Sequence, residues 1–401
     1  MPKAWIIAPV LLLSAASVTA APVRAASYQV LYRFQGGAGG FNPNATLAEA
    51  NGVLYGVTAQ GGPGIGLAYA LNPATGAFTV LHTFTGGTDG LTPNAGMIRA
   101  GRRLYGTTVQ GGSERLDQGT VYALNPATGH DRILHAFTSG ADGAQPNASL
   151  LDLQGMFYGT TLYGGQPNSL GTVFSIDRTF GAERVLHAFQ GGNDGAGPYA
   201  ALINLHGTLY GTTIYGGPGA CNDGNGIGCG TVFAIDPQTG AETVIYRFKG
   251  GSDGFYPTGL TAIGDTIYGT SSAGGNFNAG CNSFGCGTVF AIDPKTGAKR
   301  TLHAFNGGSD GWLPYAGVTA AGTTLFGTTG AGGATTCSQG CGTVFSIDAK
   351  TGAEQVLYSF QGGSDGELPV AGLLYAGGTL YGATEFGGDA ANDGTVFAIT
   401  P

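Results

Sequence analysis

Two glutamates interrupt an otherwise regular repeat and are the first candidates for acid–base chemistry. Glu385 follows Thr384, where other copies of the repeat carry a small or apolar residue, and Glu367 lies in the adjacent loop. Glu114 and Arg115 interrupt another copy. Two carboxylates about 5 to 9 Å apart could hydrolyse a glycosidic bond, whereas a lyase would use Tyr, His or Arg. A polysaccharide-degrading enzyme is therefore one hypothesis.

Aromatic side chains gather in the loops that vary between copies. They follow Asp-Gly turns or the prolines after these turns, or they end the second strand of a unit. Such side chains combine a large apolar area with a polar group and could form a platform for sugar rings or a peptide. Each one alone could equally anchor its own loop. We predict a ligand site formed by Tyr199, Tyr215, Phe255, Tyr256, Trp312, Tyr315, Glu367 and Glu385.

Six cysteines form three closely spaced pairs, Cys221/Cys229, Cys281/Cys286 and Cys337/Cys341. Each pair precedes a Gly-Thr-Val-Phe strand in one of three successive copies. Equivalent placement favours three local disulfides, which persist in an oxidising compartment. The alternative is zinc binding, because the short spacings resemble zinc motifs. No histidine is nearby, so we expect disulfides and no metal or other cofactor.

Aspartates and histidines recur too regularly to form one catalytic centre. A carboxylate ring could bind calcium, but we interpret the aspartates as turn residues that accept backbone N–H bonds. The histidines alternate with tyrosine and are expected to pack in an outer strand. The aspartates are Asp89, Asp142, Asp194, Asp253, Asp310 and Asp365, and the histidines are His82, His135, His187 and His303.

The repeat predicts an all-β chain. The pattern Leu/Ile-His/Tyr-x-Phe occurs seven times at intervals of 50 to 59 residues, from Leu31 to Leu357. Within one copy, short segments rich in Val, Ile, Thr, Tyr and Phe are bounded by Gly and Pro, which is typical of strands. For that copy we predict four strands, at residues 200–205, 208–214, 231–236 and 242–248.

The two ends of the repeat array complement each other. Residues 28–34 read as a fourth strand without its unit, and the array ends with a third strand at residues 395–400. Pairing them would leave no open sheet edge. We therefore predict a seven-bladed β-propeller of four-stranded blades, whose last blade is closed by the N-terminal strand.

The motif Leu-Tyr-Gly-Thr-Thr-x-x-Gly-Gly, followed by Gly-Thr-Val-Phe-x-Ile-Asp-x-x-Thr-Gly-Ala and Val-Leu-His-x-Phe, resembles the tandem "GloVer" repeat of exported bacterial proteins. The resemblance covers residues 27–400 and implies no established activity. The Ala-Ile-Asp-Pro-x-Thr-Gly element is also similar to blades of pyrroloquinoline-quinone propellers. Those blades carry an outer-strand tryptophan that is missing here, so we do not expect the quinone.

Composition indicates a folded, exported protein. Glycine accounts for 77 of 401 residues and charged residues for 10%, yet 42% are hydrophobic, unlike a disordered chain. A net charge of −8 argues against a nucleic-acid partner. Residues 1–25 read as a cleaved signal peptide, leaving residues 26–401 as a single domain without a transmembrane segment. We expect a secreted or periplasmic monomer that binds a polysaccharide or an extracellular protein without catalysis.

Overall fold

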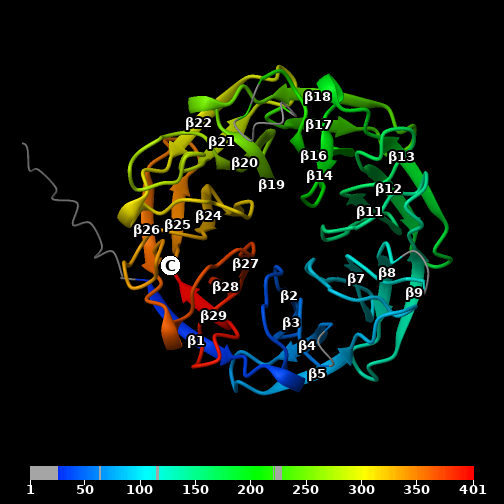
Figure 1. Cartoon of the computed structure of the whole chain (residues 1–401), viewed down its shortest axis with the longest axis horizontal. Coiled ribbons are helices and arrows are strands. Elements are labelled where there is room, and N and C mark those ends of the chain that lie inside the picture. The colour runs from blue at the N-terminus through cyan, green and yellow to red at the C-terminus, as the bar shows by residue number, and fades with distance from the viewer. Residues whose placement is uncertain (1–25, 63–64, 114–116, 220, 222–227) are drawn as a thin grey trace, which may run out of the picture.

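The computed structural model describes residues 26–62, 65–113, 117–219, 221 and 228–401. The predicted signal peptide and two of the candidate site residues, Glu114 and Arg115, lie outside the described residues. Seven antiparallel sheets surround a central axis as the blades of a propeller (Figure 1). The predicted fold is confirmed.

Blades one to six each form a meander that runs from the axis to the rim. In chain order their strands are β2 (Ala48–Ala50), β3 (Val53–Thr58), β4 (Leu67–Leu71) and β5 (Phe78–Thr83); β6 (Ile98–Ala100), β7 (Arg103–Thr108), β8 (Thr120–Leu124) and β9 (Asp131–Ala136); β10 (Leu151–Leu153), β11 (Met156–Thr161), β12 (Thr172–Asp177) and β13 (Glu183–Ala188); β14 (Ala196–Pro198), β15 (Ile203–Leu205), β16 (Thr208–Tyr215), β17 (Thr231–Ile235) and β18 (Glu242–Arg247); β19 (Phe255–Ile263), β20 (Thr266–Ala273), β21 (Thr288–Ile292) and β22 (Lys299–Ala304); β23 (Thr319–Ala321), β24 (Thr324–Thr329), β25 (Thr343–Asp348) and β26 (Glu354–Ser359).

Blade seven joins the two ends of the described chain. It consists of β27 (Leu374–Ala376), β28 (Thr379–Thr384), β29 (Thr395–Thr400) and β1 (Ser27–Arg33). β1 pairs antiparallel with β29, with Ser27 opposite Thr400 and Arg33 opposite Thr395. Figure 1 shows this blue strand beside the red one. The predicted closure of the ring is confirmed.

The hydrophobic core lies between neighbouring blades. Phe248 and Val232 of blade four pack with Ile267, Phe290 and Ile292 of blade five in one buried cluster, and similar clusters recur around the ring. Each third-strand aromatic ring needs a glycine beneath it. A Cβ at Gly211, for example, would lie 2.4 Å from Cζ of Phe233. The recurring Tyr-Gly or Phe-Gly pair is therefore a packing requirement.

The innermost strands are shorter than the sequence predicted. In blade four, residues 200–202 are not a strand, and β15 is preceded by the separate strand β14, which pairs with β16. Gly197, inside β14, has a φ of 64°, and Pro198 has no N–H for the ladder. The chain bends there and brings residue 199 to the axis.

The repeated aspartates shape the turns between blades. Several of these aspartates end a 3₁₀ turn of three residues, namely η2 (Gly192–Asp194), η3 (Gly251–Asp253), η4 (Gly308–Asp310) and η5 (Gly363–Asp365). A similar turn, η1 (Gly37–Gly39), lacks the aspartate. In six blades the carboxylate accepts the N–H of the residue four positions earlier, as Asp89 does from Thr85 at 2.7 Å. The interpretation of these aspartates as turn residues is confirmed.

Candidate functional site

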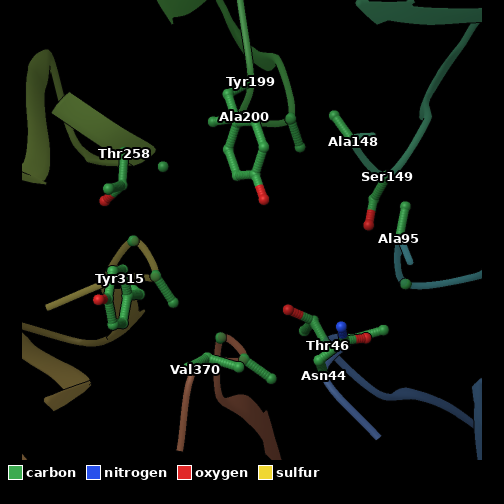
Figure 2. Close-up of a pocket in the computed structure, with 18 of the residues that line it drawn as sticks. Asn44, Thr46, Ala95, Ala148, Ser149, Tyr199, Ala200, Thr258, Tyr315 and Val370 are labelled. Atoms are coloured by element: carbon green, nitrogen blue, oxygen red, sulfur yellow. The ribbon is translucent and has the colours of Figure 1, made fainter. Parts of the chain in front are cut away.

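A cavity of about 510 Å³ lies at the axis of the ring (Figure 2). Its lining comes from the connections between blades, at the positions that directly follow a proline in each repeat. These seven positions are Asn44, Asn94, Asn147, Tyr199, Thr258, Tyr315 and Val370. A volume of this size is typical of small-molecule sites.

Backbone geometry directs these side chains toward the axis. The residue before the proline has a positive φ in every blade, as at Tyr256 (56°) and Leu313 (59°). Its N–H bonds to the preceding blade, with Tyr256 donating to Cys229 O at 3.0 Å and Leu313 to Cys286 O at 3.1 Å. Non-glycine residues adopt this conformation only at a cost of roughly 1 kcal/mol or more, so the surrounding contacts must hold it.

Three asparagines form a hydrogen-bonded ladder on one side of the cavity. Asn44 Nδ2 donates to Asn94 Oδ1, and Asn94 Nδ2 donates to Asn147 Oδ1 at 2.8 Å. Asn44 Oδ1 is buried and has no hydrogen-bond partner among the described residues. The ladder therefore ends at Asn44 in an unsatisfied acceptor.

Two tyrosines lie across the cavity from the ladder. Tyr199 is 41% exposed and Tyr315 is 44% exposed, although both belong to the innermost part of the ring. Figure 2 shows the ring of Tyr199 projecting into the open centre and the ring of Tyr315 at its edge. Burial, with a smaller contribution from the charge of Glu385, raises the pKa of the Tyr315 hydroxyl. It therefore remains a neutral donor near physiological pH.

Glu385 is the single acidic residue among the described residues that line the cavity, and none of these lining residues is Lys, Arg or His. Burial raises the pKa of its carboxyl group. The cavity thus offers amides, hydroxyls and one carboxyl group, which suits a neutral polar ligand better than an anionic one.

The eight residues predicted to bind ligand do not share one place. Tyr199, Tyr315 and Glu385 line the axial cavity. The rings of Tyr215 and Tyr256 meet edge to face with centroids 5.9 Å apart. Phe255 is only 2% exposed and packs in the core between blades. Glu367 pairs with Phe386 beside β28 and does not line the cavity.

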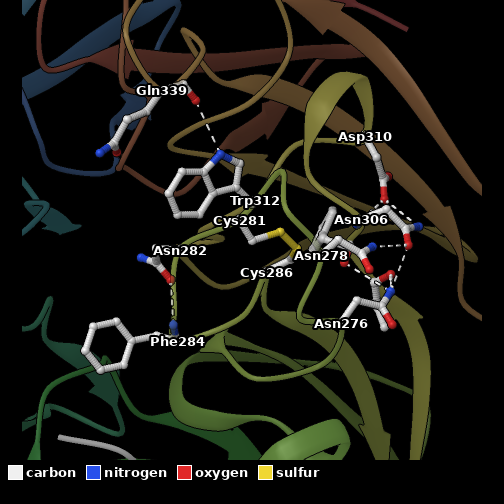
Figure 3. Close-up of a disulfide and its surroundings, with 12 residues drawn as sticks. Asn276, Asn278, Cys281, Asn282, Phe284, Cys286, Asn306, Asp310, Trp312 and Gln339 are labelled. Carbon is white, nitrogen blue, oxygen red and sulfur yellow. Dashed lines mark hydrogen bonds between the residues drawn. A yellow bond between two sulfur atoms is a disulfide. The ribbon is translucent and has the colours of Figure 1, made fainter.

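Trp312 is likewise a packing residue, since it is only 5% exposed. It lies beside the Cys281–Cys286 disulfide, and its indole donates to Gln339 O at 3.3 Å (Figure 3). The other two disulfides are Cys221–Cys229 and Cys337–Cys341, so all three predicted pairings are present. The disulfides fit an extracellular or periplasmic protein. No helix within the described residues is long and apolar enough to cross a membrane.

The asparagine ladder, Thr258 and Val370 were missed by the sequence prediction, which singled out only the tyrosines at this position. A signal was present, because the residue after the proline differs between copies whose other positions repeat closely. Aligning the seven copies on Pro43, Pro93, Pro146, Pro198, Pro257, Pro314 and Pro369 would have found the whole ring.

Comparison with protein families gives a match over most of the chain. The Gloeobacter/Verrucomicrobia repeat model matches residues 18–224 and 280–401. The chain belongs to this family. The resemblance read from the seven repeats is confirmed, and the matched segments include the proline connections of six blades. No curated protein sequence matches the chain significantly.

Solved structures show similarity in fold alone. An oligogalacturonate lyase in complex with manganese is 11% identical, with a TM-score of 0.57 and coverage of 93% of this chain and 92% of that one. An oligogalacturonate lyase from Vibrio parahaemolyticus gives 11% identity, a TM-score of 0.54 and coverage of 94% and 97%. An extracellular domain from B. thetaiotaomicron, described as part of a putative hybrid two-component system, is 13% identical with a TM-score of 0.57. The match covers 94% of this chain and 42% of that one.

Proposed function

We propose that this protein is an exported, non-catalytic binding protein that holds a neutral glycan in its axial cavity. The observation that carries this proposal is the convergence of Tyr199 and Tyr315 with the asparagine ladder around about 510 Å³ of space. Tyrosine rings can stack on the apolar faces of sugars, while amides and hydroxyls bond to sugar hydroxyls.

The chemistry of the lining supports a neutral ligand. Carboxylate ligands are commonly held by Arg in bidentate pairs, and the described lining residues include no Lys, Arg or His. Glu385 would also repel a uronate when ionised. A glycan is favoured over a protein ligand because the cavity is concave and small, whereas protein interfaces usually bury about 800 Å² per partner.

Binding without catalysis is supported by the placement of the acids. A glycosidase of the common type uses two carboxyl groups about 5 to 9 Å apart. Glu385 lines the cavity, but the other candidate, Glu367, does not. We therefore assign Glu385 a role in hydrogen bonding to the ligand.

The test is a glycan array containing neutral and uronic-acid oligosaccharides, followed by calorimetry on the ligands that bind. Tyr199→Ala and Tyr315→Ala should each weaken binding of a neutral glycan by at least about tenfold, equivalent to about 1.4 kcal/mol. Tyr375→Ala is the matched control, since Tyr375 is 41% exposed but does not line the cavity. The Tyr375→Ala variant should bind the glycan with the affinity of the parent protein.

Three results would contradict the proposal. The first is a preference for uronic-acid oligosaccharides, and the second is equal loss of binding in Tyr375→Ala. The third is release of reducing ends or unsaturated products from a bound glycan, with release abolished by Glu385→Gln. That outcome would make Glu385 a catalytic residue and the protein a polysaccharide-degrading enzyme.

A further inference from the structure

A second recurring cluster lies far from the axis, in the clefts between the outer strands of neighbouring blades. Each cluster combines an outer-strand histidine, the aspartate of the following turn, and an acidic residue from the outer strand of the next blade. Within the described residues, three such groups place their possible ligand atoms within 4.8 Å of one another: His82, Asp89 and Asp131; His187, Asp194 and Glu242; His303, Asp310 and Glu354.

The histidine and aspartate are held in place by their surroundings. Nε2 of His303 lies 3.0 Å from Oδ1 of Asp310, and the imidazole packs edge to face on Phe305. Asp310 Oδ2 accepts the backbone N–H of Asn306 at 2.7 Å. The His187 and His82 clusters have the same arrangement, with His–Asp distances of 3.1 Å. Two of the three ligand atoms are thus preorganised.

In two of the clusters the third residue is a glutamate whose carboxyl group has an oxygen without a partner in the described part of the chain. Oε1 of Glu242 and Oε1 of Glu354 are buried and have no hydrogen-bond partner among the described residues. Burial, reinforced by the neighbouring aspartate, raises the pKa of each glutamate to about 7. Two carboxyl groups and one imidazole therefore face each other in each cleft, and the imidazole, joined by Arg247 at the Glu242 cleft, only partly offsets the rise in the glutamate pKa.

One blade interface supplies a cation of its own in this cleft. Between blades four and five, Tyr246 takes the place of the histidine and Lys299 takes the place of the acid. Lys299 Nζ lies 3.0 Å from Oδ1 of Asp253 and 2.7 Å from its carbonyl oxygen. The ammonium group is also 5.5 to 5.7 Å from the ring centroids of Tyr246, Phe248 and Phe290.

Around the ring, the identity of the outer-strand residue, histidine or tyrosine, goes with the identity of the residue that faces it from the next blade. Each interface with an outer-strand histidine has an acid on the next blade, and each interface with a tyrosine has none. The tyrosine interfaces pair Tyr246 with Lys299, Tyr358 with Tyr28 and Tyr32 with Phe78. The remaining histidine, His135, faces Asp142 at 3.4 Å, but with Glu183 it does not form a group as close as the other three. The histidine and the acid therefore occur as a unit.

We propose that the three His–Asp–acid clefts bind divalent transition-metal ions, with Zn²⁺ the best fit. An imidazole nitrogen favours zinc over calcium and magnesium, which prefer sites built from oxygen alone. In a tetrahedral zinc site adjacent ligand atoms are about 3.3 Å apart, given bonds of about 2.0 Å. The His–Asp distances of 3.0 to 3.1 Å are close to that value.

Solvent can supply the fourth ligand. Surface cavities of about 520 Å³ and 500 Å³ lie over the His82 and His303 clusters, respectively. Binding replaces the hydrogen bond between His and Asp, because the imidazole must present a lone pair to the metal. Any proton on the imidazole or glutamate is released to solvent. Because each ion bridges two blades, zinc binding should stabilise the ring.

The test is a zinc titration of the full-length protein, produced without a polyhistidine tag and freed of metal with a chelator. Equilibrium dialysis followed by metal analysis should give three equivalents of Zn²⁺ and none of Mg²⁺ under the same conditions. The double substitution His303→Tyr with Glu354→Lys should reduce the count by one equivalent. This variant should fold, because it copies the Tyr246–Lys299 pair of the same protein.

The reciprocal variant, Tyr246→His with Lys299→Glu, should gain one equivalent. Circular dichroism and urea unfolding verify that both variants are folded, and saturating Zn²⁺ should raise the Tm of the parent protein. His206→Ala is the control for nonspecific zinc binding at the surface, because Nε2 of the exposed His206 lies 2.8 Å from Oδ1 of Asp265. This variant should bind as many equivalents of zinc as the parent protein. Failure of the parent protein to retain zinc, or an unchanged count in the two folded double variants, would overturn the proposal.

Discussion

Two arcs of the ring use the same inner position in different ways. In blades one to three the residue after the proline is asparagine, and the three amides bond to one another. In blades four to six it is Tyr199, Thr258 or Tyr315, and both tyrosines are exposed to the cavity. All three disulfides also belong to the second arc. The asparagines of one arc bond to one another, whereas the tyrosines of the other arc are exposed in the cavity.

Two blades of the first arc also differ from the other blades in their core. The ring that packs over the second-strand glycine is tyrosine in blades one and two, at Tyr69 and Tyr122, and phenylalanine in the others. Both hydroxyls are buried without a hydrogen-bond partner among the described residues. The comparison teaches that the scaffold tolerates two buried hydroxyl groups without partners in the described part of one arc, while the residue after the proline varies between the arcs at the axis.

The largest expected effect comes from exchanging these core residues between arcs. Tyr122→Phe should increase the free energy of unfolding, and Phe233→Tyr should decrease it by roughly 1 to 3 kcal/mol, because it buries a hydroxyl without a partner. Urea unfolding followed by circular dichroism measures both. If Tyr122→Phe lowers the free energy of unfolding, the Tyr122 hydroxyl makes a favourable interaction. It would then be wrong that this hydroxyl is a cost to the first arc.

The next effect concerns the asparagine ladder. Asn94→Ala removes two side-chain hydrogen bonds and leaves Asn44 Nδ2 and Asn147 Oδ1 without their partner. We expect a loss of roughly 1 to 2 kcal/mol in unfolding free energy. Val370→Ala alters the same ring position in blade seven without breaking a polar contact and should cost less. An equal loss in the two variants would mean that the ladder adds no stability.

Much of the fold could be predicted from sequence because it depends on periodic residues. Seven copies of one strand pattern set the number of blades, and the unpaired strand at residues 28–34 required a partner at residues 395–400. The local bend at Gly197 and Pro198 was harder to predict. It depends on a left-handed backbone held by contacts with the preceding blade, which no short segment specifies by itself.

The smallest effect tests the one carboxyl group of the cavity. Burial raises the pKa of Glu385, so the folded protein disfavours the charged form, and this group contributes less stability as the pH rises through its pKa. Glu385→Gln should therefore raise the Tm at pH 8 and leave it nearly unchanged below about pH 4, where the carboxyl group is protonated. Thermal unfolding across this range gives the answer. A shift of equal size at all pH values would contradict the assignment.

The candidate site was only partly predictable. Interruption of the repeat identified Tyr199, Tyr315 and Glu385, which line the cavity. The same reasoning selected Trp312 and Phe255, which are buried. An unusual aromatic residue in a loop can fill a gap beneath that loop or face a ligand, and the sequence pattern is the same. Burial depends on how the neighbouring blade packs, which the pattern of one repeat does not contain.

The pairing of β1 with β29 also has a kinetic consequence. The ladder that joins Ser27 to Thr400 brings together residues from opposite ends of the repeat array, and contacts of such long sequence separation form slowly. During synthesis, blades one to six can each assemble from contiguous chain, whereas blade seven must wait until the final strand is available. Until then the edges of β1 and the last completed blade stay open, so the growing chain is most prone to aggregation just before β29 is made.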